Sequence, residues 1–158
     1  MQEIDNITLA DLSEIKATRG RIIAVDFGEV RTGLAISDAS RFLASGIGNV
    51  RVGGIDKTAA EVARIATERG AVAAVVGLPK NMDGSEGARA ERCRDFARRL
   101  SAASGIPVTM TDERLTTVAA SRYLNETDTR GGKRKNIIDS LSAEIILQNT
   151  LDRLKNLS

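Results

Sequence analysis

Acidic residues stand at the ends of the structural elements that the sequence predicts. Asp26 follows the apolar run 22–25, Asp112 and Glu113 follow the last predicted strand, and Asp139 lies near the start of the last predicted helix. A carboxylate at the end of a buried strand is costly to leave unpaired. Clustered carboxylates repel one another unless a cation neutralises them, and oxygen ligands with water in the remaining positions suit Mg²⁺. One or two such ions can activate water and stabilise the leaving oxygen in phosphodiester hydrolysis.

Each carboxylate also has a structural alternative. Asp26 could stabilise the glycine-containing turn that follows it, and Asp112 could be the N-cap of the next helix. Glu113 is a poorer cap, which favours a ligand role for it. With Asn136 as N-cap, Asp139 would lie in the first helical turn, where the helix dipole favours a carboxylate. The residues that follow on its helix face are mostly small, however, which would let the helix approach the sheet with Asp139 pointing inward.

The predicted order of elements would bring these carboxylates to one edge of a sheet. Two apolar runs around a glycine-containing turn predict a β-hairpin over residues 21–38, and residues 42–52 predict a third antiparallel strand. Strands are then predicted at 71–78 and 106–111, and helices at 56–69, 88–103, 117–124 and 136–154. A meander continued by right-handed crossovers gives an α/β fold with a mixed five-stranded sheet and helices on both faces. The carboxyl ends of its parallel strands lie on one side, where α/β proteins place their sites.

The first twenty residues form a predicted extension to a domain that spans residues 21–158. Apolar residues between Ile4 and Ile15 would line one face of a short helix, with Thr8 as its N-cap. We expect this extension to cover part of the domain or of a partner, and we assign no chemistry to it.

Composition limits the chemistry that is possible. The chain of 158 residues should form one domain, and it contains no histidine and a single cysteine, Cys93. The missing histidine excludes Ser-His and Cys-His triads, so any metal must be a hard cation held by oxygen ligands. A lone cysteine suits a reducing compartment. The N-terminus lacks a long apolar segment and the run 71–76 is too short to span a bilayer, so we expect a cytoplasmic protein.

The formal net charge is only +2, but the basic residues are concentrated in a few segments. The loop GLPKNMDGSEG at 77–87 follows a predicted buried strand and precedes a helix, so its amides could hold a phosphate beside Lys80. A glycine-rich connection without a ligand explains the same spacing. A second cluster precedes Asp139 in a predicted loop, which suits contact with a phosphate backbone, whereas the arginines of the 88–103 helix also fit a solvated face. The candidate nucleic-acid-binding residues are Arg31, Lys80, Asn81, Arg114, Arg130, Lys133, Arg134 and Lys135.

Four segments carry a resemblance to a known family. They are VDFGEVRTGLAISD at 25–38, VVGLPKNMDGSEGARAE at 75–91, DERLTTVAA at 112–120 and KRKNIIDSLSAEIILQ at 133–148. In this order they resemble the YqgF/RuvX family of resolvase-like proteins and pre-16S rRNA nucleases. The resemblance implies a ribonuclease H-like fold and phosphodiester cleavage that depends on a divalent metal, Mg²⁺ or Mn²⁺. It also implies an active site formed by Asp26, Glu113 and Asp139, and no acidic position of the family is missing here.

The resemblance leaves the substrate open. A ribosomal role implies trimming of the 5′ end of the 16S rRNA precursor with the pre-ribosome as partner, and we favour it because it fits a small single domain. A resolvase role implies a four-way DNA junction and a homodimer that cuts two strands. A further alternative is an RNA-binding assembly factor without catalysis. The Asp26-x-Gly28-x4-Gly33 spacing also resembles the first phosphate loop of actin-like ATPases, but those proteins need two such domains facing one nucleotide.

Overall fold

The structure of the chain, a computed structural model, describes residues 6–112 and 131–157, and for 131–139 only the course of the backbone. Within these ranges the strands and helices follow the predicted order. No helix in the described part of the chain is long and apolar enough to cross a membrane.

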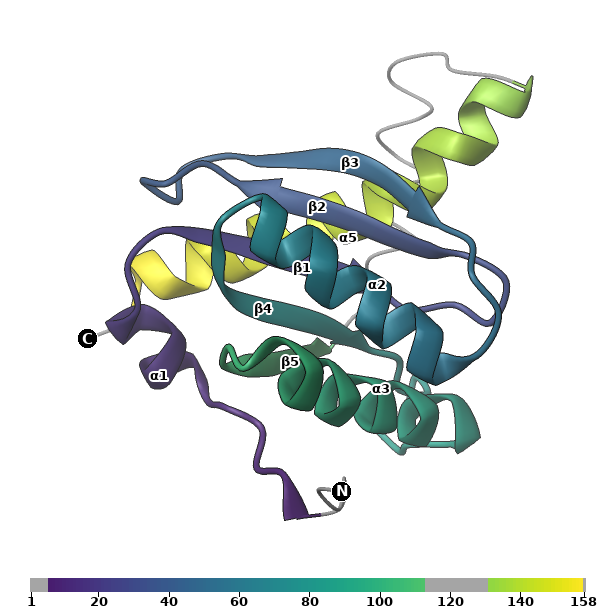
Figure 1. Cartoon of the computed structure of the whole chain (residues 1–158), viewed down its shortest axis with the longest axis horizontal. Helices are drawn as coiled ribbons and strands as arrows, with labels where there is room; N and C mark the ends of the chain where they lie inside the picture. The colour runs from purple at the N-terminus through teal and green to yellow at the C-terminus, as the bar shows by residue number, and fades with distance from the viewer. Residues whose placement is uncertain (1–5, 113–130, 158) are drawn as a thin grey trace.

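A mixed five-stranded sheet forms the centre of the molecule (Figure 1). Strands β1, β4 and β5 are parallel, whereas β1 pairs antiparallel with β2 and β2 pairs antiparallel with β3. The carboxyl ends of β1, β4 and β5 therefore lie at one edge of the sheet, as predicted. The strands are β1 (Arg21–Asp26), β2 (Thr32–Ser37), β3 (Ala44–Val50), β4 (Ala71–Leu78) and β5 (Val108–Asp112), in the spatial order β3-β2-β1-β4-β5.

Helices cover both faces of the sheet (Figure 1). The helices α2 (Ile55–Glu68) and α3 (Ala88–Ser104) pack on one face, and α5 (Gly131–Lys155) packs on the other together with the short α1 (Leu12–Ala17). After α2 and α3, Gly70 and Gly105 adopt φ angles of 73° and 72°. Glycine takes this left-handed conformation without steric cost, so both helices end close to where the sequence predicts.

Side-chain alternation along the strands divides the core into two clusters. In β1, Ile23 and Val25 face α2 and α3, whereas the residues between and before them face α5. The cluster under α2 and α3 contains Phe27 and Phe96, whose stacked ring centroids are 4.5 Å apart. The residues that the sheet contributes to the α5 cluster are mostly small: Ile22, Ala24, Ala35, Ala73 and Val75.

Strand β3, predicted at 42–52, is irregular where it contains Gly46 and Gly48. Its register with β2 shifts between Gly46 and Gly48, which leaves Ile47 as the extra residue of a β-bulge. Ile47 and Val50 pack on the side of α2 and α3. Gly46 and Asn49 consequently face α5.

The segment before β1 packs against the sheet and α5, and its helix begins later than predicted. The N-cap of α1 is Asp11, whose carboxylate accepts a hydrogen bond from the Glu14 amide at 2.9 Å, so the prediction of Thr8 is wrong. Aspartate is the stronger cap of the two, and it lies at the correct spacing from the amide that it binds. Ile15 is fully buried in the α5 cluster, and the Ala10 amide donates to a carbonyl of β5 at 2.8 Å.

The last helix is longer than predicted. It begins at Gly131, so Asn136 is not its N-cap and Asp139 lies in its third turn instead of its first. The basic residues 133–135 therefore belong to a helix and not to a loop. Lysine and arginine are good helix formers, and glycine is tolerated at a helix start, so the charged run extends the helix. The predicted helix at 117–124 lies outside the described residues.

Candidate metal and nucleic-acid site

Asp26 ends β1 on the face of the sheet that α5 covers. It continues the alternate series of Ala24, which packs in the α5 cluster, and its side chain is half-buried. On one side, Asp26 pairs with Gly33 of β2. On the other side, the last pair between β1 and β4 is Val25 with Val76, so Gly77 is the residue of β4 beside Asp26. Neither of these two neighbouring positions therefore carries a side chain beside Asp26.

Asp112, at the end of β5, belongs to the opposite face. Val108 and Met110 pack in the cluster under α2 and α3, and Asp112 continues their alternate series and is exposed. Asp112 therefore does not share a face of the sheet with Asp26. The predicted ligand Glu113 lies outside the described residues.

The third predicted ligand, Asp139, is carried by α5, which crosses the face of Asp26. Its backbone lies four residues before Ala143, which is fully buried against the sheet. The structure thus places the helix beside this face of the sheet. The side chain of Asp139 is not among those that the structure describes.

Helix α5 and strand β3 touch at Gly46. A Cβ atom on Gly46 would lie 2.1 Å from the Ser140 Oγ and 3.5 Å from the Glu144 Oε2. Burial raises the pKa of Glu144 above its usual value, and a hydrogen bond from the Gly46 amide partly opposes this shift. Since only glycine leaves room for this contact, the residue helps to determine how closely the first half of α5 approaches the sheet.

Asn49 is a polar residue on this face that the sequence reasoning missed. It pairs with Gly33, which in turn pairs with Asp26. Neighbouring strands lie about 4.8 Å apart, so roughly 10 Å separates the two backbones with only a glycine between them. Within the described part of the chain, the Asn49 Oδ1 is buried and has no hydrogen-bond partner. Such an acceptor is costly to leave unpaired. The face of the sheet on which Asn49 lies depends on where the bulge falls, and the glycines of β3 do not give that position.

The described donors fit a hard cation in kind. They are the Asp26 carboxylate and the unpaired amide oxygen of Asn49, in a chain without histidine. Among the residues that the structure describes, no group of three acidic, cysteine or histidine side chains could hold a metal ion. The predicted group of three ligands includes Glu113 and Asp139, and the structure does not describe the side chain of either residue.

The turn after β1 brings Arg31 to the same edge of the sheet as Asp26. A Cβ atom on Gly28 would lie 2.3 Å from the Arg31 carbonyl oxygen, so only glycine fits there. The Gly28 amide donates to the Thr32 hydroxyl at 3.4 Å, which closes the turn. The close approach of the Arg31 carbonyl therefore explains why position 28 is glycine.

The loop after β4 lies at this edge as well, and Asn81 closes it. The Asn81 amide donates to the Ser85 carbonyl at 2.8 Å, and its Nδ2 donates to the Ser85 hydroxyl at 3.0 Å. Asp83 accepts a hydrogen bond from the Ser85 amide at 2.9 Å. Lys80 precedes this closed loop and is half-buried.

Three of the predicted nucleic-acid-binding residues thus lie at the edge that carries Asp26. These are Arg31, Lys80 and Asn81. Arg114 and Arg130 lie outside the described residues, as do the side chains of Lys133, Arg134 and Lys135.

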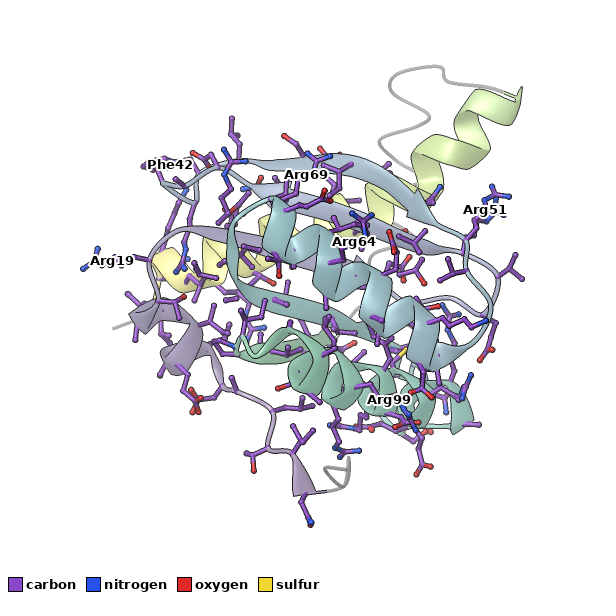
Figure 2. All side chains as sticks on the ribbon, in the orientation of Figure 1. Arg19, Phe42, Arg51, Arg64, Arg69 and Arg99 are labelled. Atoms are coloured by element: carbon purple, nitrogen blue, oxygen red, sulfur yellow. The ribbon has the colours of Figure 1, made fainter. Side chains whose placement is uncertain are left out.

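Three of the five arginines of α3 form ion pairs. Arg92 contacts Glu29 at 3.0 Å and Arg94 contacts Glu86 at 2.8 Å, and hydrogen bonds from these arginines lower the pKa of both carboxylates. Arg99, labelled in Figure 2, pairs with acidic residues of α2 and of its own helix. Paired charges of this kind favour the solvated-face interpretation of the helix over a nucleic-acid contact.

The fold defines the class of protein. The structure is similar to RuvC of T. thermophilus in complex with a Holliday junction substrate, with a TM-score of 0.56, 13% identity and coverage of 88% of this chain and 98% of that one. It is also similar to the fowlpox virus resolvase in complex with Holliday junction DNA, with a TM-score of 0.55, 11% identity and coverage of 85% and 98%. At such identities the likeness shows the fold alone, and it confirms the predicted ribonuclease H-like architecture of RuvC-type proteins.

Sequence comparison identifies the family. The model of the RuvX family, described as Holliday junction resolvase, matches residues 20–153. A Cereibacter sphaeroides protein named "Putative pre-16S rRNA nuclease" is 45% identical over 135 residues, which are 85% of this chain and 84% of its own length. A Bradyrhizobium diazoefficiens protein of the same name is 41% identical over 151 residues, with coverage of 96% and 94%. The chain belongs to the RuvX family, as its four motifs predict.

Proposed function

We propose that this chain is a metal-dependent endonuclease that matures the 5′ end of the 16S rRNA precursor. The observation that carries the proposal is the placement of Asp26 at the end of a buried strand, under α5 and between two glycine positions. Membership of the RuvX family supports nuclease activity, and the names of the relatives favour the ribosomal precursor as substrate. We expect the protein to act in the cytoplasm, where the buried Cys93 thiol stays reduced.

Asp26, Glu113 and Asp139 are the proposed metal ligands. Asp26 faces α5, and α5 carries Asp139. On β5, the hydroxyl of Thr111 accepts a hydrogen bond from α5 at 3.4 Å, so the odd-numbered residues of this strand face the same helix. Glu113 continues the odd series in the sequence, and for this reason we assign the ligand role to it and not to Asp112.

The chain's own residues would bind and orient the nucleic acid at this edge. When bound, Mg²⁺ or Mn²⁺ would supply the Lewis acid that activates water and stabilises the leaving oxygen. The Asn49 Oδ1 has no hydrogen-bond partner among the described residues and lies on the same face of the sheet as Asp26, so it would accept a hydrogen bond from a water or hydroxyl group bound there. Arg31 and Lys80 lie at the same edge, where their charges would attract the phosphate backbone and set its direction.

The test is cleavage of a model precursor that carries the mature 5′ end and its leader. Asp26→Asn should lower kcat by about a thousandfold, equivalent to roughly 4 kcal/mol of transition-state stabilisation, because it removes a ligand charge. RNA affinity, measured in EDTA, should change less than about twofold. Asp112→Asn is the matched control, because this neighbouring carboxylate faces the other side of the sheet. If the Asp26→Asn variant cuts as fast as the parent, the proposed site is wrong.

A second candidate is cleavage of a four-way DNA junction. The description of the RuvX family and the fold shared with RuvC favour it. A synthetic junction is therefore tested beside the precursor RNA with the same protein, together with the oligomeric state by sedimentation. Preferential cutting of the junction by a dimer would replace the ribosomal proposal. Binding of RNA without cleavage of either substrate in Mg²⁺ or Mn²⁺ would instead identify an assembly factor.

A further inference from the structure

A basic pocket lies at the edge of the sheet where β1 begins, opposite the edge of Asp26. This distal pocket is a cavity of about 370 Å³ between α1, the turn that joins β2 to β3, and the end of α5. None of the described residues that line it is acidic. Its cations, which come from separate segments of the chain, are Lys16, Arg19, Arg41 and Lys155.

Two acidic residues adjacent in sequence to this lining accept hydrogen bonds from uncharged amide groups. Asp38 accepts hydrogen bonds from the amides of Phe42 and Leu43, at 2.8 and 3.1 Å. Asp152 accepts one from Gln148 at 3.3 Å. Burial, together with the nearby charge of another arginine, lowers the pKa of the Arg41 guanidinium. The pocket therefore gathers positive charge that would be stabilised by an anion.

The turn that forms one wall of the pocket is held from two sides. Arg41 has a φ of 62°, a conformation that a side chain other than glycine keeps only where its surroundings enforce it. Its guanidinium donates three hydrogen bonds to the segment before β1, at 2.6 to 3.1 Å. From α5, Gln148 donates to the Phe42 carbonyl at 3.2 Å and accepts from the Ala44 amide at 3.1 Å. The wall is thus pre-organised before any ligand arrives.

This rigid turn presents an aromatic ring to solvent. Phe42 is 59% exposed, whereas Phe27 and Phe96 stack in the core. The Lys155 ammonium lies 4.9 Å from the centre of the Phe42 ring. Figure 2 shows Phe42 and Arg19 at the same end of the molecule. An exposed ring beside several cations is the combination that holds single-stranded nucleic acid, by base stacking and by charge.

We propose that the distal pocket binds a single-stranded segment of nucleic acid, with a phosphate on its cations and a base on Phe42. The site is separate from Asp26, because the six residues of β1 lie between them, about 20 Å at roughly 3.3 Å per residue. Its cations need no metal, so binding here does not depend on the proposed nuclease activity. A protein ligand for the exposed Phe42 and Leu43 is the competing outcome of the test.

The experiment measures binding of a fluorescent single-stranded RNA of about 20 nucleotides to the full chain in EDTA, by anisotropy. The double variant Arg19→Glu/Lys155→Glu should bind at least about tenfold more weakly at low salt. Its slope of log K against log salt should fall by about 0.7, the contribution of the one phosphate that the pocket no longer neutralises. Both side chains are exposed and take no part in the core, so the fold should be unchanged.

The control reverses two charges elsewhere. Lys57 and Arg69 are exposed residues at the two ends of α2, on the other face of the molecule, and Lys57→Glu/Arg69→Glu changes the net charge equally. This variant should bind within about twofold of the parent. Phe42→Leu keeps an apolar side chain but removes the stacking surface, and it should weaken binding about fivefold. If the distal variants bind like the parent, or no more weakly than the control, the proposal is wrong.

Discussion

The α2/α3 face and the α5 face of this sheet are filled with side chains of very different size. Under α2 and α3, Phe27 stacks on Phe96 and large aliphatic side chains fill the space around them. Under α5, the sheet offers alanines, and the positions beside Asp26 and below Ser140 are glycines. Large interlocked side chains stabilise a fold, whereas small ones let a helix come close to the sheet. The same sheet thus separates the part that provides stability from the part that positions the site.

Removal of the central ring should have the largest effect on stability. Phe96→Ala deletes a fully buried side chain that stacks on Phe27, so we expect the free energy of unfolding to fall by about 3–5 kcal/mol. Urea denaturation measures this change. Cleavage per folded molecule should stay within about twofold of the parent, because the ring lies on the face away from Asp26. A selective decrease in cleavage at unchanged stability would contradict the division between the faces.

A single methyl group added on the α5 face should lower stability less than Phe96→Ala and the cleavage rate more. Gly46→Ala places a Cβ atom 2.1 Å from the Ser140 Oγ, which must rotate away, and 3.2 Å from the Ser140 Cβ, which we expect to push α5 outward at about 1–3 kcal/mol of stability. Because α5 carries Asp139, we expect the cleavage rate to fall at least about tenfold. Gly53→Ala is the control, since no described atom lies within 4 Å of that Cβ position. Equal cleavage by the two variants would show that the approach of α5 does not position the site.

The smallest expected effect concerns pH. Burial raises the pKa of Glu144, so its charged form destabilises the folded state above the folded pKa, and this cost disappears as pH falls below the unfolded pKa. Glu144→Gln should therefore raise the Tm by about 1 °C at pH 7 and leave it unchanged near pH 4. Thermal unfolding at both pH values tests this, with the exposed Glu91→Gln on α3 as control. A stabilisation that is equal at both pH values would exclude titration of this carboxyl as its cause.

Much of the fold could be predicted because its signals are local. The run 71–78 is apolar throughout, as a strand covered on both faces must be, and Gly70 and Gly105 mark helix ends by a conformation that suits glycine. The start of α5 could not be predicted in the same way. Residues 131–135 are polar and charged, and they are as compatible with a loop as with an exposed helical turn.

The candidate site was predictable to the extent that it follows strand ends. Asp26 lies where the apolar run predicts, whereas the orientation of Asn49 depends on a bulge that shifts the alternation of β3. Asp38 could not be given a role from the sequence, because its hydrogen bonds to the amides of the following turn exist only once the hairpin has formed. Long-range geometry of this kind leaves no periodic signal in a single sequence.

The most direct test of the proposed metal site is a crystal structure of the full chain soaked in Mn²⁺. We expect an anomalous peak about 2.1 Å from a carboxylate oxygen of Asp26, with Glu113 and Asp139 as further ligands of the same ion. A Mn²⁺ ion bound by Asp112 on the opposite face would contradict the proposed site. So would a crystal soaked to saturation in Mn²⁺ that shows no ion at Asp26.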